Sequence, residues 1–156
     1  MKWSELFDKW SLSGLKVKAA FVEMDFMPND VDKNAAWEMY VEMKTRVTTQ
    51  ELNDEDGNEV AALDSIYKLF QLTRDVLKQY GRYSPDFSRI ALFILNEEIR
   101  PFTAKWHKLS IEGKPKDTKE RKIFRKELKK LQSTLKAYAS ILEDMAGVEG
   151  LSIRKK

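Results

Sequence analysis

The single histidine of this 156-residue chain, His107, must carry any chemistry that needs an imidazole. It follows Arg100 in the segment RPFTAKWH, which gives the two residues an Arg-x6-His spacing. On a continuous helix these positions share one face, two turns apart, and Pro101 is expected to kink the helix and change their separation. Histidine can transfer a proton at a ribose hydroxyl or a leaving 5′-oxygen, while a guanidinium stabilises the charge on the phosphate. Arg100 and His107 are therefore the candidate catalytic residues for metal-independent cleavage of RNA.

Two other roles remain open for Arg100 and His107. In the first, both residues are structural: they cap the kinked backbone and pair with Glu97 or Glu98. In the second, they bind a partner molecule. The spacing does not choose among the three roles, because it does not say whether the two side chains point into a cleft.

A second group of polar residues recurs at helical spacing. Glu38, Glu42 and Arg46 lie four residues apart and so share one ridge of a helix, and Arg74 and Arg100 add guanidiniums on later helices. One interpretation is a solvated surface, where each i,i+4 pair contributes about 0.2–0.5 kcal/mol. The other is a half-buried polar seam in which these charges neutralise one another, because unpaired buried charges are strongly disfavoured. The candidate binding residues are Glu38, Glu42, Arg46, Arg74, Lys105 and Trp106.

Charge is distributed unevenly along the chain, although the net charge is only +3. Residues 22–64 hold twelve Asp and Glu against three Lys and Arg, whereas residues 105–130 hold eleven Lys and Arg against four acids. The solvent side of the last predicted helix forms a basic face that could neutralise the phosphates of RNA or DNA. The alternatives are a solvated face, or docking onto an acidic partner surface. The basic face consists of Lys119, Lys122, Arg125, Lys126, Lys129 and Lys130.

Several classes of site are excluded by the residues that the chain lacks. There is no cysteine, which excludes disulfides, zinc ribbons, iron–sulfur clusters and thiol catalysis. The acidic segment DEDG resembles a calcium loop, but the first and twelfth ligand positions would be Leu52 and Leu63, which cannot bind the ion. The longest apolar run, residues 90–95, is far below the about 20 residues of a membrane span. We therefore expect a cytoplasmic protein with no metal, no cofactor and no membrane contact.

Apolar periodicity predicts four long helices and one extended segment. Partial alternation over residues 15–26 predicts a strand, with a frayed helix as the competing interpretation. Apolar residues at spacings of three and four predict helices over about 31–49 and 59–80. Ser84 and Pro85 begin a third helix as N-cap and first residue, and Pro101 kinks it.

The last helix is predicted from Asp117, as N-cap, to Gly147, and its apolar residues keep a heptad spacing from Phe124 to Met145. This heptad seam can pack on the other helices of the chain or form a homodimer. The sequence therefore predicts one mainly α domain over residues 1–156: a four-helix bundle with a kinked third helix and a long C-terminal helix. Residues 1–27 form an extended N-terminal arm, and residues 150–156 a basic tail.

Two resemblances follow from these residues. The Arg-x6-His spacing in a helical chain resembles the Arg-x4–6-His motif of HEPN ribonucleases, which implies catalysis by Arg100 and His107 in a cleft shared by two protomers. That family has a polar residue after the arginine, where this chain has Pro101. The segments AAWEMYVE, TR at 45–46 and 73–74, and RPFTAKWH resemble a family of small bacterial proteins that is associated with multi-gene anti-phage operons. This second resemblance implies a bacterial cytosolic protein that works with neighbouring subunits, and it gives no information about catalysis.

Three functions follow from this reasoning. The first is a non-catalytic interaction subunit that docks other protein subunits of a bacterial multi-component system. The second is a HEPN-like ribonuclease that uses Arg100 and His107. The third is a helical module that binds nucleic acid through the basic face.

Overall fold

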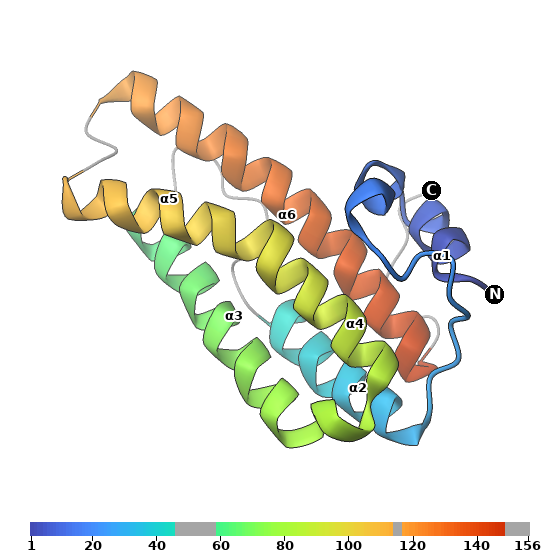
Figure 1. The fold of residues 1–156 in the computed structure, drawn as a ribbon. Coiled ribbons are helices and arrows are strands. Elements are labelled where there is room, and N and C mark those ends of the chain that lie inside the picture. Colours follow the sequence, from blue (N-terminus) through green and yellow to red (C-terminus); the bar gives the residue numbers. More distant parts are fainter. Residues whose placement is uncertain (46–58, 114–116, 149–156) are drawn as a thin grey trace.

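The computed structural model describes residues 1–45, 59–113 and 117–148, and within them the chain is mainly helical, as predicted (Figure 1). Short 3-10 turns, η1 and η3, and one π-helical segment, η4, connect or interrupt the α-helices. The elements are α1 (Trp3–Lys9), η1 (Ser13–Lys18), α2 (Asp30–Lys44), α3 (Glu59–Tyr80), η3 (Gly81–Tyr83), α4 (Pro85–Ile94), η4 (Leu95–Ile99), α5 (Arg100–Ile111) and α6 (Thr118–Ala146).

Four long rods make up the bundle: α2, α3, the consecutive run α4–η4–α5, and α6 (Figure 1). The bounds of α3 and α6 agree with the predicted helices, while the described part of α2 ends at Lys44. All the apolar heptad positions of α6, from Phe124 to Met145, are buried inside the chain. The heptad seam therefore packs within the bundle, and a homodimer through the C-terminal helix, which stays a prediction, would need another face of α6.

The third rod passes through Pro101 without reversing direction (Figure 1). Proline has no N–H to donate, and its ring crowds the preceding turn. The chain adapts just before it: Leu95–Ile99 is π-helical, and the N–H of Arg100 bonds to the carbonyl of Leu95, five residues back. Arg100 itself keeps α geometry, contrary to the expectation that proline would disfavour it there. Such π-bulges often occur at helix kinks, and this one keeps Arg100 and His107 on one rod.

The predicted strand over residues 15–26 is wrong. The described N-terminal segment folds as α1, η1 and turns, and its one β-bridge joins Lys2 to Asp25. Alternation would place Val17 and Ala19 on the same face, yet Val17 is 95% exposed and Ala19 is 3% exposed. The segment instead folds over the buried Trp3 ring, which makes T-shaped contacts with the rings of Phe7, Phe21 and Phe26. A compact aromatic cluster thus replaces the strand, since a lone strand leaves its backbone groups unpaired.

Side-chain caps begin α2 and α6, and the predicted Asp117 and Gly147 bound α6. Asn29 accepts the N–H of Asp32 at the start of α2, and Asp117 accepts the N–H of Glu120 at the start of α6. Gly147 ends α6 in the left-handed conformation, with φ 72°, which costs glycine little. Pro85 occupies the first turn of α4, but the Ser84 hydroxyl donates to the carbonyl of Tyr80 instead of capping α4.

Two buried carboxylates join the beginnings of α2 and α4. Asp32 accepts the N–H of Phe87, in the first turn of α4, at 2.9 Å. Asp86 accepts the N–H of Met27, just before α2, at 2.8 Å, and also the guanidinium of Arg89. Each carboxylate therefore satisfies donors from the other helix end, which holds α2 against the third rod.

Candidate functional site

Two open grooves run along opposite sides of α3, and they carry opposite charge. The first, called here the basic groove, has a volume of about 530 Å³ and lies between α3 and the third rod. The second, the acidic groove, has a volume of about 350 Å³ and lies between α2 and α3. The basic groove is lined by Phe70, Arg74, Leu77, Lys78, Leu92, Leu95, Asn96 and Arg100. The acidic groove is lined by Trp37, Glu38, Val41, Glu42, Leu72, Asp75, Val76 and Gln79.

The sequence of α3 explains why one helix serves both grooves. Phe70, Arg74 and Lys78 recur every four residues and so follow one stripe of the helix surface. Asp75 and Gln79 recur likewise on the stripe that meets α2. On the inner side of the helix, the buried core positions Ile66, Leu69 and Thr73 lie between the two stripes.

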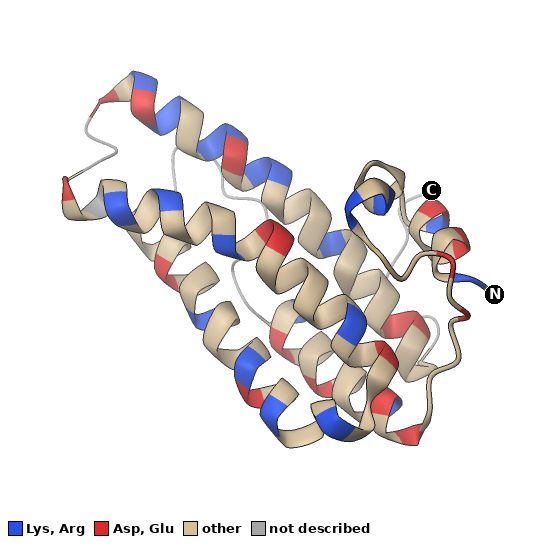
Figure 2. Cartoon of the chain, in the orientation of Figure 1, with Lys and Arg blue, Asp and Glu red and all other residues tan. Residues whose placement is uncertain are grey.

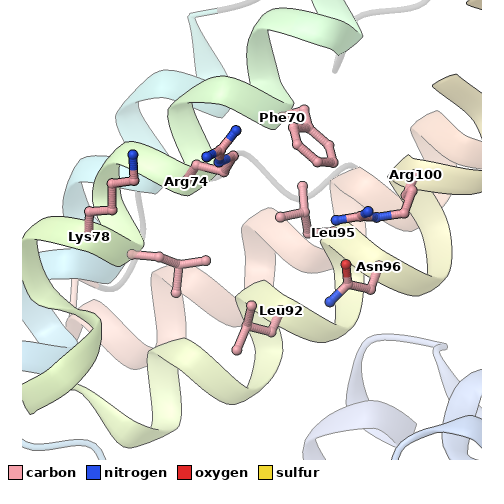
Figure 3. A pocket seen from close by; sticks show the side chains of 8 residues that line it. Phe70, Arg74, Lys78, Leu92, Leu95, Asn96 and Arg100 are labelled. Atoms are coloured by element: carbon pink, nitrogen blue, oxygen red, sulfur yellow. The ribbon is translucent and has the colours of Figure 1, made fainter. Parts of the chain in front are cut away.

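The basic groove contains three cationic side chains and no carboxylate among its lining residues. Arg74 and Lys78 extend from α3, and Arg100 extends toward them from the start of α5 (Figure 3). Within the described ranges, none of the three forms an ion pair. Asn96 adds an amide, and Leu92, which is 46% exposed, adds an apolar wall. The groove thus combines positive charge with apolar surface.

A ladder of planar groups continues from this groove along α3 and α5, and we call it the stacking ladder. The guanidinium of Arg100 lies over the ring of Phe70, with its central carbon 5.2 Å from the ring centroid. The Phe70 ring stacks with Tyr67 at 6.5 Å and 20°. Tyr67 in turn stacks with His107 at 5.8 Å and 26°. Tyr67 is 45% exposed and His107 is also exposed, so the ladder is open to solvent.

The stacking ladder shows what becomes of the predicted catalytic pair. Arg100 and His107 do lie on the same side of α5, facing α3, as their spacing indicated. Each of them packs against a different ring of α3, and no hydrogen bond joins them in the described structure. Neither pairs with Glu97 or Glu98 there, so the ion pairs that the structural role required are not formed. Phe70 and Tyr67 of α3 thus lie between the two side chains of the predicted pair.

The acidic groove holds the other predicted binding residues of α2. Glu38 accepts the hydroxyl of Tyr80 in a short hydrogen bond, and this bond, together with burial, raises the pKa of Tyr80. Trp37 stacks on Tyr40 at 5.9 Å and remains 42% exposed. Val41, one turn further along α2, is 38% exposed. Solvent thus reaches an aromatic and an aliphatic side chain beside carboxylates.

The structure separates the described residues of the predicted polar seam into two groups. Glu38 and Glu42 line the acidic groove, whereas Arg74 and Arg100 line the basic groove on the other side of α3. Arg46 lies outside the described residues.

Lys105 and Trp106 contribute to the contact between α5 and α6 rather than to either groove. Trp106 is buried and meets the Phe124 ring edge-on at 4.9 Å. Its indole N–H donates to Oε2 of Glu127 at 2.7 Å, and the ammonium of Lys105 pairs with the other oxygen of the same carboxylate. Glu127 therefore anchors both side chains.

The basic face of α6 is exposed along most of its length, and Figure 2 shows Lys and Arg concentrated on the half of α6 nearest its N-terminus. Arg125 is the exception, because its guanidinium forms an ion pair with Glu59 of α3 at 3.1 Å, and both side chains are largely buried. Lys119, Lys122, Lys126, Lys129 and Lys130 remain on the surface as predicted. No aromatic ring stacks beside them in the described structure.

Sequence reasoning missed several residues of this region. Tyr67, Phe70 and Lys78 were assigned no role, although an aromatic pair at i,i+3 and cations at i,i+4 were visible in α3. Their partners on α5 could not be identified from spacing. Asp32 and Asp86 were also missed, because their short-range pattern is that of ordinary first-turn acids.

Comparison with protein-family models, with curated proteins and with solved structures finds no match to this chain. In the described part of the chain, no helix has both the length and the apolar composition that a membrane span requires. The same residues contain no cluster of three or more His, Asp and Glu side chains placed to hold a metal ion.

Proposed function

We propose that this protein is a non-catalytic accessory subunit that docks a partner protein through the acidic groove. The observation that carries the proposal is the exposure of Trp37 and Val41 in a groove edged by Glu38, Glu42 and Asp75. Tryptophan dominates many protein interfaces because it buries a large area at little cost in side-chain entropy. An exposed tryptophan in a concave site is thus well suited to anchor a partner.

The shape and charge of the groove define the partner. A groove between two helices accepts an amphipathic helix whose apolar residues recur at i, i+3 and i+4. Three acidic residues around the apolar wall favour lysine and arginine on the flanks of that helix. The partner segment is therefore a basic amphipathic helix.

Two further points support an accessory role. His107 stacks on Tyr67 and Arg100 lies over Phe70, so each side chain of the candidate catalytic pair is engaged with a different ring of α3. In addition, Trp37, Val41 and Glu42 belong to the segment that resembles the bacterial family described above. The resemblance supports a partner that is another component of a bacterial, anti-phage multi-component system.

Site-specific photocrosslinking in bacterial cells tests the proposal. A benzoyl-phenylalanine placed at Val41, in the groove, is compared with the same group at Ile123, which is 43% exposed on α6. We expect one defined protein to crosslink at position 41 only. With that partner purified, Trp37→Ala should weaken binding by about 30-fold, as is typical when a hot-spot residue is removed, and Ile123→Ala should leave binding unchanged.

Two results would contradict the proposal. Equal crosslinking at positions 41 and 123, or unchanged affinity after Trp37→Ala, would remove the acidic groove from the interface. Metal-independent degradation of RNA that is lost in a folded His107→Ala variant would replace the accessory role by the ribonuclease function.

A further inference from the structure

We propose that the basic groove and the stacking ladder together bind single-stranded nucleic acid. This site lies on the opposite side of α3 from the acidic groove, and the inference does not depend on protein docking there. It also differs from the basic face of α6, for which the charge of the sequence alone indicated nucleic-acid binding. Three observations carry it: the charge of the groove, the exposed planar groups, and the continuity between them.

The first observation concerns charge. Arg74, Lys78 and Arg100 line one groove, and none of them forms an ion pair with a carboxylate of the described residues. Asp64, on an earlier turn of α3, pairs with Lys68 at 3.3 Å. Cations held on a surface in this way attract phosphates and release counterions when a strand binds.

The second observation concerns the planar groups. Bases of single strands stack on Phe, Tyr, Trp and His rings and on arginine guanidinium planes. The stacking ladder consists of these side-chain types: Arg100, Phe70, Tyr67 and His107, with neighbouring groups 5.2–6.5 Å apart. Because Tyr67 and His107 are exposed, a base can approach them without rearrangement of the bundle.

The third observation is that charge and rings are continuous, because Arg100 and Phe70 belong to both the groove and the ladder (Figure 3). A strand can therefore place its phosphates along Arg74, Lys78 and Arg100 while its bases lie toward Tyr67 and His107. A duplex cannot do this, since its bases are already stacked and paired. The basic face of α6 offers only charge, which distinguishes the two candidate surfaces.

Fluorescence anisotropy with labelled 12-nucleotide oligo(U) and oligo(dT) tests this inference on the full chain. Tyr67→Ala removes the exposed ring and should weaken binding by about 5- to 150-fold, the range for loss of one stacking platform. Tyr67→Phe keeps the ring and should bind as the unaltered protein does. Comparison of the two oligonucleotides shows whether RNA, DNA or both are ligands, and binding of either supports the proposal.

A second measurement separates the groove from the basic face. The double variant Arg74→Ala/Lys78→Ala should flatten the dependence of log K on log salt by about 1.4, because each phosphate contact contributes about 0.7 for a single strand. The matched control Lys122→Ala/Lys126→Ala removes two charges from α6 and should leave affinity and slope unchanged. All substituted side chains are exposed, so melting temperatures should agree with that of the unaltered chain.

The proposal is overturned by any of three results. These are no binding of either oligonucleotide at 50 mM salt, equal affinity of Tyr67→Ala and Tyr67→Phe, or a loss of affinity in the α6 control that matches the loss in the groove variant. Preference for a 12-base-pair duplex over both single strands would also exclude the stacking mode.

Discussion

Replacement of Asp32 by alanine should loosen the connection between α2 and α4. The Asp32 side chain is completely buried, and its two oxygens accept the backbone N–H groups of Asn29 and Phe87, each at 2.9 Å. Alanine leaves both donors without this acceptor. A buried donor that loses its partner costs about 1–3 kcal/mol, so the two together should cost about 2–6 kcal/mol. For a chain of this length, each kcal/mol lowers the melting temperature by about 2–4 °C, which gives a total decrease of about 4–24 °C.

The assay is thermal and urea unfolding followed by circular dichroism at 222 nm, with Asp30→Ala as the matched control. Asp30 lies in the same first turn of α2 but is exposed, so only its interaction with the helix dipole is lost, at most about 1 kcal/mol. Asp32→Asn should fall between the two, because its amide oxygen keeps one acceptor. If Asp32→Ala unfolds at the same temperature as Asp30→Ala, the argument that this carboxylate joins the two helix ends is refuted.

Three further substitutions test other contacts by the same unfolding measurements. Glu127→Ala should destabilise the fold by about 2 kcal/mol because the buried indole N–H of Trp106 loses its acceptor, whereas Glu127→Gln should cost less; equal stability of the two would contradict this. Tyr138→Phe should leave stability unchanged or raise it, since the buried hydroxyl has no partner in the described structure, and a large loss would reveal a missed hydrogen bond. Burial raises the pKa of Glu98 in the folded chain. The protonated carboxyl therefore stabilises the fold at acid pH, and this contribution to the free energy of unfolding is lost as the pH rises through the raised pKa. Glu98→Gln should therefore raise the melting temperature at pH 7, with a gain that shrinks toward acid pH; a gain that grows there would contradict the sign.

The helices were predictable because their signals are local. The apolar residues of α3 and α6 recur every three or four positions, and Asn29, Asp117 and Gly147 provide the caps at the predicted places. The N-terminal segment was not predictable in the same way. Its partial alternation suggested a strand, but Phe21 and Phe26 of that segment both pack on the buried Trp3 ring, and the segment folds into turns around it.

The candidate site was predictable only in part. Helical spacing correctly placed Arg100 and His107 on one side of a helix and Glu38 and Glu42 on one ridge. Helical spacing could not predict that rings of α3 lie between Arg100 and His107. Nor could it predict that the acids of α2 and Arg74 line grooves on opposite sides of α3. For the same reason, spacing predicted Lys105 and Trp106 as binding residues, whereas in the structure both side chains contact Glu127 of α6.

For the long helices of the bundle, the sequence by itself determines which segments become helical and which stripe of each is buried, because side-chain periodicity and caps act over one or two turns. Only the tertiary structure decides which helices face each other. That choice depends on how all the apolar stripes fill one core at once, and no short stretch of residues encodes it. The choice sets Phe70 and Tyr67 of α3 between Arg100 and His107 of α5, so that the predicted catalytic pair forms the two ends of one series of stacked planar groups.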